Sequence, residues 1–453
     1  MINMENQTVL YGCTVTNGRY IPSAHQPVIM FDSPTGQMFA LDELTIFKNV
    51  LLTGGAGSGK TNVMNQIVMQ SRSWQSYVDA FHFIFDTKSD YINHKGFFRE
   101  GDYIIGNGPS FRNRSAVWNV FDEVLIDTES TIPLDSDEEQ DYELNAKEIA
   151  KVIFHGRGST TQPFFVNAAR DIFSHTIIYF IRRYRDNYAV WKDKLNNYDL
   201  KKFILSNGPK EFKNYFSIYP DMRGLISYFD TDAKGQAQSV FSELRSMVYE
   251  CFQGVFAKKP RGNSFSIRKA VRTKLNRALF LEYDLSVGEV LTPMYRLLVD
   301  LALKEALSEN ANGRVHFYLD ELKLLPKVSH LQDALNFGRS KLVSVTAGIQ
   351  NIDQLYTGYG ESVAKEILQG FSTMFAFKAT DHTTRDYVSQ RFGPNVVSYR
   401  YYSHGHQPVD NVREGFTVEH WHQQNLAIGQ AVIGLASQAE PFIFTFNKDP
   451  FEE

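Results

Sequence analysis

The residues best suited to chemistry form one eight-residue stretch, from Gly54 to Thr61. The stretch fits the pattern G-x-x-x-x-G-K-[ST], in which backbone N–H groups of a glycine-rich loop surround phosphate oxygens. In this pattern the lysine reaches the β- and γ-phosphates and the hydroxyl ligates Mg²⁺, which gives these roles to Lys60 and Thr61. The sequence therefore predicts a site for ATP and Mg²⁺, made of Gly54, Gly55, Ala56, Gly57, Ser58, Gly59, Lys60 and Thr61.

The residues around this loop favour the same interpretation. Residues 50–53 form a short apolar run typical of a buried strand, and residues 62–70 carry apolar side chains at helical spacing. A helix that begins at the loop adds the positive end of its dipole to the phosphate site. The alternative is a glycine-rich turn that matches the pattern by chance, and the flanking strand and helix argue against it.

A second carboxylate-bearing strand end completes the expected site. Residues 315–319 are an apolar run followed directly by Asp320 and Glu321. Asp320 is expected to hold the Mg²⁺ shell through water, and Glu321 to polarise the water that attacks the γ-phosphate. The alternative is an ordinary turn at the end of a strand. The catalytic interpretation of Asp320 and Glu321 is favoured because the same chain carries the phosphate-binding loop.

The elements around these motifs predict an α/β protein. Apolar runs predict strands at residues 80–85, 103–105, 277–283, 315–319, 342–347, 373–379, 431–435 and 442–446, and a hairpin at residues 8–30. Between them, residues 140–255 are mostly helical in pattern. A mostly parallel sheet is expected because strands and helices alternate. A helix is expected to begin near Pro293, and another at residues 330–339 with Ser329 and Gln332 at capping-box spacing.

The spacing of the two motifs predicts an insertion. Roughly 260 residues separate Lys60 from Asp320, whereas a bare core needs a few tens of residues per βα unit. We expect a RecA-like P-loop core in two parts, residues 1–118 with the hairpin and loop, and residues 262–453 with the carboxylate pair. An all-α domain inserted at residues 119–261 would lie between them.

Bulk composition sets limits on partners and location. The 453 residues are 43% hydrophobic and 22% charged, with a net charge of −4, so any contact with nucleic acid must come from a local basic region. No apolar run reaches the roughly 18 residues of a membrane helix, so no membrane segment is expected. Cys13 and Cys251 lie far apart in sequence, which favours a reducing, cytoplasmic setting over a disulfide framework.

One basic region stands out between residues 258 and 277. It could follow a phosphate backbone without reading sequence if it faced a channel. An ordinary solvated face is an equal alternative. The eight basic residues are Lys258, Lys259, Arg261, Arg268, Lys269, Arg272, Lys274 and Arg277.

Two histidine pairs suggest a metal site at first sight. His404 and His406, and His420 and His422, are spaced by two residues. Neither pair is accompanied by cysteines or a clear carboxylate set, so the sequence argues against a zinc site there. The aromatic residues Phe371, Phe375 and Phe377 are interpreted as core.

The motifs together resemble the coupling proteins of type IV secretion and conjugation, TraG/TraD-like ATPases of the HerA/FtsK superfamily. Residues 85–91 are similar to the family's strand with an Asp-x-Lys segment, and residues 118–121 to the segment before its all-α domain, with Val120 where proline is usual. The most specific part of the resemblance is a combination of three segments. These are residues 319–322, Gly338-Arg339-Ser340-Lys341 and residues 348–350. Family members typically have an N-terminal transmembrane anchor, and none is expected in this sequence.

The resemblance implies a homo-hexameric ring motor on DNA with ATP bound between subunits. Arg339 would act as a finger on the neighbour's ATP, and Gln350 would sense its γ-phosphate. The residue-based alternatives are a helix-end charge for Arg339 and a loop cap for Gln350. Expected partners are DNA, a relaxase and secretion-channel components, with peripheral placement at the inner face of the membrane through a partner.

The resemblance leaves other functions open. One is a HerA-type DNA-processing or defence motor that works with a nuclease. Another is a recruitment module that uses ATP only as an assembly switch and does not translocate. The chain could also stay monomeric until DNA or a platform assembles the ring. Neither the kind of DNA strand nor the partner follows from the residues.

Overall fold

The computed structural model describes residues 7–16, 26–74, 79–93, 96–128, 136–156, 163–229, 234–262, 264–402 and 408–448. They divide into two compact units. Unit 1 comprises the described parts of Met1–Asp102, Leu275–Ala278 and Asn312–Glu453, and unit 2 those of Tyr103–Lys274 and Leu279–Ala311. Unit 2 therefore interrupts unit 1 in the sequence, while the domain boundaries at residues 119 and 261 stay a prediction.

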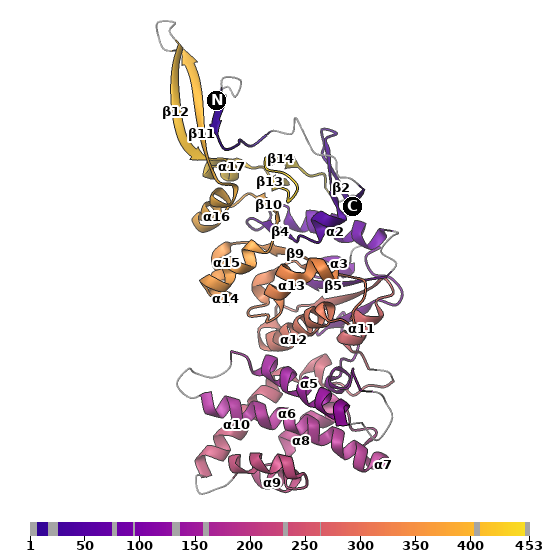
Figure 1. Cartoon of the computed structure of the whole chain (residues 1–453). Coiled ribbons are helices and arrows are strands. Elements are labelled where there is room, and N and C mark those ends of the chain that lie inside the picture. Colours follow the sequence, from indigo (N-terminus) through magenta and orange to yellow (C-terminus); the bar gives the residue numbers. More distant parts are fainter. Residues whose placement is uncertain are drawn as a thin grey trace. The chain divides into compact units, whose positions relative to one another are not determined.

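The main sheet of unit 1 is mostly parallel (Figure 1). Its strands follow the order β14-β13-β10-β4-β9-β8-β5. Each neighbouring pair of strands from β10 to β5 is parallel, and β13 is antiparallel to both β10 and β14. Their bounds are β4 Val50–Thr53, β5 Ala80–Asp86, β8 Arg314–Leu319, β9 Val343–Ile349, β10 Thr373–Phe377, β13 Gln430–Gly434 and β14 Phe442–Thr445.

Register brings the carboxyl ends of the central strands to one edge. Thr53 pairs with Ile349 across β4 and β9, and Leu319 pairs with Ala347 across β8 and β9. The helices and 3₁₀ turns of unit 1 are α1 Glu43–Ile46, α2 Lys60–Ser73, α3 Asp90–Asn93, η6 Leu322–Leu324, α13 Leu331–Phe337, η7 Gly338–Lys341, α14 Ile352–Tyr359, α15 Glu361–Gln369, α16 His382–Phe392 and α17 His420–Asn425. The expected RecA-like α/β core is confirmed.

Aromatic packing fills part of the core of unit 1. Phe39 stacks on Phe31 at a centroid distance of 4.8 Å and meets Phe444 edge-on at 4.7 Å. Phe375 and Phe377 are fully buried, as is Phe371. Their interpretation as core residues is confirmed.

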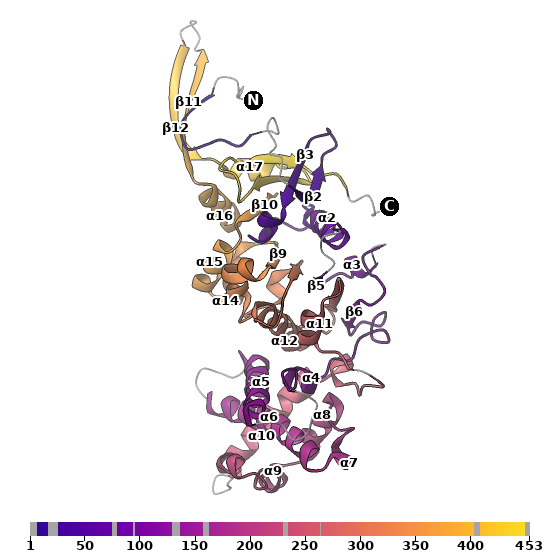
Figure 2. The ribbon, with the colours of Figure 1, turned by 45° about the vertical axis from the view of Figure 1, so that its right-hand side comes forward.

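Two smaller sheets also belong to unit 1. β2 (Pro27–Asp32) pairs with β3 (Met38–Asp42), and β1 (Gln7–Tyr11) pairs with β11 (Pro394–Tyr402), which pairs with β12 (Pro408–Phe416). Figures 1 and 2 show the long β11–β12 hairpin with β1 beside it. The predicted hairpin at residues 8–30 is therefore wrong in its pairing, and its predicted turn at residues 17 and 18 lies outside the described residues. Strands distant in sequence supply the partners instead.

Unit 2 is mainly helical (Figure 2). Its strand β6 (Tyr103–Gly106) pairs in parallel with β7 (Arg277–Glu282). The helical pattern expected for residues 140–255 is confirmed for the described part. The helices and 3₁₀ turns are α4 Val120–Val124, α5 Ser136–Phe154, α6 Pro163–Asp186, α7 Tyr188–Trp191, α8 Asn197–Ser206, α9 Pro209–Phe216, η3 Pro220–Tyr228, α10 Lys234–Cys251, η5 Gly254–Ala257, α11 Ile267–Thr273 and α12 Gly288–Leu307.

Two predicted helix starts differ from the structure. α12 begins at Gly288 and carries Pro293 inside it. α13 begins after His330, whose side chain makes no capping hydrogen bond, and Gln332 instead donates its amide to Glu366. The capping box predicted from Ser329 is therefore wrong. Among the described helices, none has the length and apolar character needed to cross a membrane.

Candidate nucleotide site

The glycine-rich loop joins β4 to α2 at the carboxyl edge of the sheet, and backbone hydrogen bonds fasten it there. The Gly54 N–H donates to the carbonyl oxygen of Ile349 at 3.2 Å, and the Gly55 N–H donates to that of Lys378 at 2.8 Å. The Gly429 N–H in turn donates to the Ser58 carbonyl oxygen at 3.0 Å. Neighbouring strands therefore hold the loop in place before any ligand contacts it.

Gly59 turns the loop into the helix. It is the N-cap of α2 and has a φ of 107°, which favours glycine. A Cβ atom here would also lie 3.1 Å from the Gly429 Cα. Because Lys60 and Thr61 open the helix, the N–H groups of this first turn have no helical acceptor. An anion is the natural partner for such groups.

The Lys60 side chain lies over the loop. Its Nζ donates to the carbonyl oxygens of Gly54 and Gly55, at 2.5 and 3.0 Å. Burial lowers the pKa of the Lys60 ammonium, and the carboxylates of Glu321 and Asp320 oppose that shift. The carboxylate pair and the lysine therefore act on each other electrostatically, as the sequence predicted from two motifs far apart.

The carboxylate pair follows β8 and is almost fully buried. Asp320 and Glu321 are each 7% exposed. Burial raises the pKa of Asp320 to about 7, with Lys88 opposing the shift, and burial also raises the pKa of Glu321. A Cβ on Gly348 of β9 would lie well inside van der Waals contact with the Asp320 carbonyl oxygen. Glycine is thus required where β9 passes the carboxylate pair.

Gln350 joins the pair directly. Its Nε2 donates to Glu321 Oε2 at 2.5 Å. The other oxygen, Glu321 Oε1, is buried without a hydrogen-bond partner in the described part of the chain, as are the hydroxyls of Thr53 and Ser58. Buried polar atoms of this kind normally have a partner. Their position beside the loop fits a polar ligand and its water.

The structure also places residues to which the sequence gave no firm role. Asp86 is 1% exposed and accepts from the N–H groups of Lys88 at 3.0 Å and Tyr91 at 2.9 Å. It therefore holds the turn before α3. Lys88 acts electrostatically on both Asp320 and Lys60. The sequence signal that could have placed Lys88 at the site is its position two residues after Asp86, at the end of a strand.

Arg339 does not join this site. It lies in η7, before β9 begins, so it is at the opposite edge of the parallel strands. β9 has seven residues, so its ends are about 20 Å apart. Arg339 is exposed, and its side chain makes no hydrogen bond or ion pair with any described residue. The Arg339 side chain is therefore too far from the glycine-rich loop of its own chain to contact a phosphate bound there.

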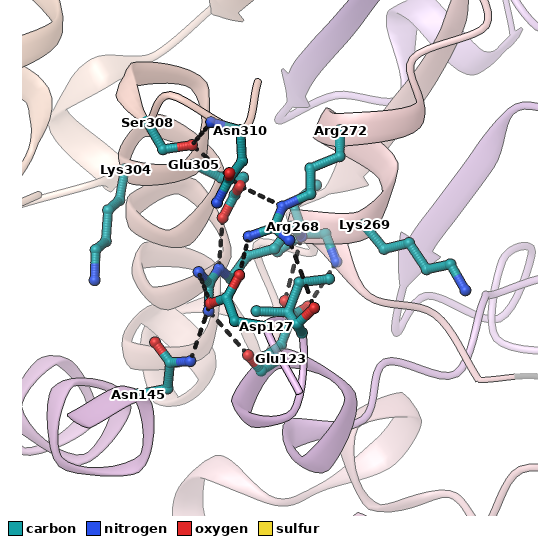
Figure 3. A network of polar contacts seen from close by, with 12 residues as sticks. Glu123, Asp127, Asn145, Arg268, Lys269, Arg272, Lys304, Glu305, Ser308 and Asn310 are labelled. Atoms are coloured by element: carbon teal, nitrogen blue, oxygen red, sulfur yellow. Dashed lines mark hydrogen bonds and ion pairs between the residues drawn. The ribbon is translucent and has the colours of Figure 1, made fainter. Parts of the chain in front are cut away.

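The basic region at residues 258–277 differs from the predicted phosphate-binding surface. Figure 3 shows Arg268 and Arg272 turned into a polar network of unit 2. Arg268 is 7% exposed and bonds Glu305 at 2.7 Å and Asp127 at 3.1 Å. Arg272 bonds the same two carboxylates, at 2.6 and 2.5 Å. These four residues are called the α11–α12 network below.

Further members of the region also have protein partners. Lys274 is 1% exposed, Lys258 donates to the Arg112 carbonyl oxygen, and Lys259 bonds Asp199 at 3.1 Å. The prediction that the region forms a phosphate-tracking surface is therefore wrong for Arg268, Arg272 and Lys274. The acidic partners lie far away in sequence or on another helix, so the linear charge run gave a false impression of free positive charge.

Glu123 anchors the start of α11 beside the network. Its carboxylate accepts from Trp118 Nε1 at 2.8 Å and from the Ile267 N–H at 2.6 Å. Burial raises the pKa of Glu123 to about 7, and these hydrogen bonds oppose the shift. Glu123 of α4 thereby holds Trp118, which precedes α4, and Ile267, the first residue of α11.

Comparison with known proteins supports this reading of the fold. The family model for the type IV secretion-system coupling protein DNA-binding domain matches residues 41–438. Coupling protein TraD of Escherichia coli K12 is 23% identical over 382 residues, which cover 82% of this chain and 48% of TraD. Conjugal transfer protein TraG of Rhizobium radiobacter is 27% identical over 170 residues, 34% of this chain and 26% of TraG. The chain thus spans about half of TraD and about a quarter of TraG.

Solved structures share the fold. The unbound conjugative coupling protein TrwBdeltaN70 aligns with a TM-score of 0.75 at 18% identity, over 98% of this chain and 94% of that one. TrwB in complex with the ATP analogue ADPNP aligns with a TM-score of 0.72 at 17% identity, over 98% and 95%. The match of the family model to most of the sequence shows that this chain belongs to the family of the type IV secretion-system coupling protein DNA-binding domain.

Proposed function

We propose that this chain binds ATP and Mg²⁺ and uses hydrolysis to move DNA, or a DNA–protein complex, toward a type IV secretion channel. The observation that carries the proposal is the convergence of Lys60, Asp320, Glu321 and Gln350 at one sheet edge in a chain of this family. TrwB, which shares the fold, has been solved with ADPNP and with ADP and Mg²⁺.

Each residue has a role that its surroundings support. The N–H groups of the loop would hold the phosphates, and Lys60 would exchange its bonds to Gly54 and Gly55 for the β- and γ-phosphate oxygens. Thr61 and Asp320 would hold Mg²⁺, Thr61 directly and Asp320 through water. Glu321 would polarise the attacking water, because its buried carboxyl has the raised pKa that suits a general base.

Gln350 would report the state of the γ-phosphate. In the structure its amide donates to Glu321, so a bound γ-phosphate and its water would compete for the same groups. Loss of the phosphate would let the amide return to the carboxylate. This exchange gives a physical route from hydrolysis to movement of the segment after β9.

Arg339 would act on the nucleotide of a second copy of the chain. Its exposure and its place at the far edge of β9 support action in trans. An interface between different faces of two copies closes into a ring when the rotation allows it. We therefore propose a homo-hexamer with shared sites, which could form only when DNA or a platform brings the monomers together.

The remaining partners follow from the family alone. The proposed substrate is DNA, carried with a relaxase, and the proposed receiver is a secretion-channel component. The all-α insertion proposed for residues 119–261 would meet the substrate complex. The chain would reach the inner face of the membrane through such a partner.

The first test is the steady-state ATPase rate with and without single- and double-stranded DNA. Wild type should be stimulated by DNA. Lys60→Ala should lose nucleotide binding, and Glu321→Gln should keep it while the rate falls about 100-fold or more. Glu366→Gln, which removes a carboxylate bonded to Gln332, should behave as wild type.

Two results would contradict the proposal. Normal ATP hydrolysis by Glu321→Gln would show that Glu321 is not the general base. A wild-type rate that ignores DNA at every protein concentration would contradict a DNA motor and favour an ATP-dependent recruitment switch.

A further inference from the structure

Three metal-binding side chains meet on unit 1, far from the nucleotide loop in sequence. His382 Nδ1 lies 2.8 Å from Asp386 Oδ2, and His420 Nε2 lies 2.8 Å from Asp386 Oδ1. The three ligand atoms all lie within 4.8 Å of one another. His382 and Asp386 share one face of α16 because they are four residues apart, and His420 is the first residue of α17.

These groups have the right chemistry for a transition metal. Two imidazoles and one carboxylate are a common donor set for Zn²⁺, with bonds of about 2.0 to 2.2 Å. Tetrahedral ligands at that distance are about 3.3 Å apart, so the two 2.8 Å contacts must open by about half an ångström. Side-chain rotation can supply this because His382 is 73% exposed and Asp386 is 39% exposed.

The position of the cluster suggests what a bound ion would do. The chain between α16 and α17 forms the β11–β12 hairpin (Figure 1). A metal bound by both helices would therefore join the two ends of this hairpin. We propose that His382, Asp386 and His420 form a surface zinc site that clamps the base of the β11–β12 hairpin, with water completing the coordination.

The site differs from the histidine pairs that the sequence draws attention to. His422 does not belong to it, because its Nδ1 accepts a hydrogen bond from the Glu419 N–H at 3.0 Å. His404 and His406 lie outside the described residues. The partner of His420 comes from α16, 34 residues earlier in the sequence, so spacing along the chain could not reveal it.

The test is a titration of untagged protein with ZnCl₂ by calorimetry, in excess Mg²⁺ to occupy the nucleotide site. Wild type should bind one Zn²⁺ per chain. His382→Ala, Asp386→Asn and His420→Ala should each weaken binding at least tenfold, and all three should unfold as wild type does without zinc. The double variant His404→Ala/His406→Ala should bind as wild type does.

Two further readouts separate a metal site from an ion-pair cluster. Co²⁺ in place of Zn²⁺ should give the visible absorption of tetrahedral coordination in wild type and lose it in Asp386→Asn. Zinc should also slow amide hydrogen exchange in α17 of wild type only. The titration ends at about 100 µM Zn²⁺. If wild type binds no Zn²⁺ by that concentration, or if Asp386→Asn binds it equally well, the proposal is overturned and the three residues form an ion-pair cluster only.

Discussion

At the scale of single residues, the candidate nucleotide site holds two buried carboxyl groups whose ionised forms are unfavourable. Asp320 and Glu321 are both nearly excluded from water, and burial raises the pKa of each. The cations that oppose this are Lys60, Lys88 and Lys323. A divalent cation would relieve the excess negative charge more effectively than a single lysine, because it brings two positive charges close to the carboxylates.

This charge balance predicts a pH dependence of metal binding. Mg²⁺ binds deprotonated carboxylate, and Asp320 has a pKa raised to about 7. Below pH 7 Asp320 must lose a proton before it can hold the Mg²⁺ shell, so Mg²⁺·nucleotide affinity should fall by up to about tenfold per pH unit and level off above pH 7. Fluorescent-nucleotide binding between pH 5.5 and 8.5 measures this slope.

Asp320→Asn provides the control for that slope. It should bind Mg²⁺·nucleotide weakly at every pH, and the slope assigned to Asp320 should disappear. A wild-type affinity that stays flat from pH 5.5 to 7 would show that Asp320 is already ionised there and would contradict the buried, charge-strained site.

At the scale of elements, the approach of β9 to the end of β8 positions the carboxylate pair. Only glycine fits at residue 348, because a Cβ would collide with the Asp320 carbonyl oxygen. Gly348→Ala should therefore lower the free energy of unfolding by about 1–3 kcal/mol and reduce the ATPase rate through displacement of Asp320. Chemical unfolding and ATPase assays measure both effects.

Gly235→Ala is the matched control for this substitution. A Cβ at residue 235, in α10, meets nothing within 4 Å, so alanine should raise stability by about 0.4–1 kcal/mol. Equal stability of Gly348→Ala and wild type would show that β8 and β9 can separate without cost.

The α11–α12 network should stabilise unit 2 and should not contact DNA. Arg268→Ala leaves Glu305, which is 1% exposed, with Arg272 as its one remaining arginine, so it should cost about 1–3 kcal/mol. Lys269→Ala, a neighbouring exposed position whose side chain points away from the network in Figure 3, should change stability by less than about 0.5 kcal/mol.

Urea unfolding and the salt dependence of DNA affinity check this prediction together. Arg272→Ala should leave the slope of log affinity against log salt unchanged in folded protein, because its guanidinium is already bound to Glu305 and Asp127. A slope lower by about one would mean that Arg272 contacts a phosphate.

The elements also show what could be read from the sequence. The loop, its strand and the Asp-Glu pair were predictable because each combines a local motif with an apolar run, and parallel strands bring such ends to one edge. The contacts of Arg268 with Asp127 and of His420 with the His382–Asp386 pair were not predictable, because they join elements that are far apart in the sequence. The pairing of β1 with β11 was missed because these two strands lie near opposite ends of the sequence.

At the scale of the whole molecule, the proposed function implies that one copy of the chain holds an incomplete site. Its loop and carboxylates are at the carboxyl edge of the sheet, while Arg339 is exposed at the other edge. If the site is shared, the copy that holds a nucleotide does not supply the arginine for that same site, which comes from a second copy. Activity then depends on assembly.

Mixing two inactive variants tests this central claim most directly. Glu321→Gln keeps Arg339, and Arg339→Ala keeps Glu321, so each should be inactive alone in the presence of DNA. Mixed one to one, about a quarter of the interfaces join an intact carboxylate to an intact arginine. The account predicts that the ATPase rate returns to about a quarter of the wild-type rate. A mixture no faster than the mean of its two components, or a fully active Arg339→Ala, would contradict it.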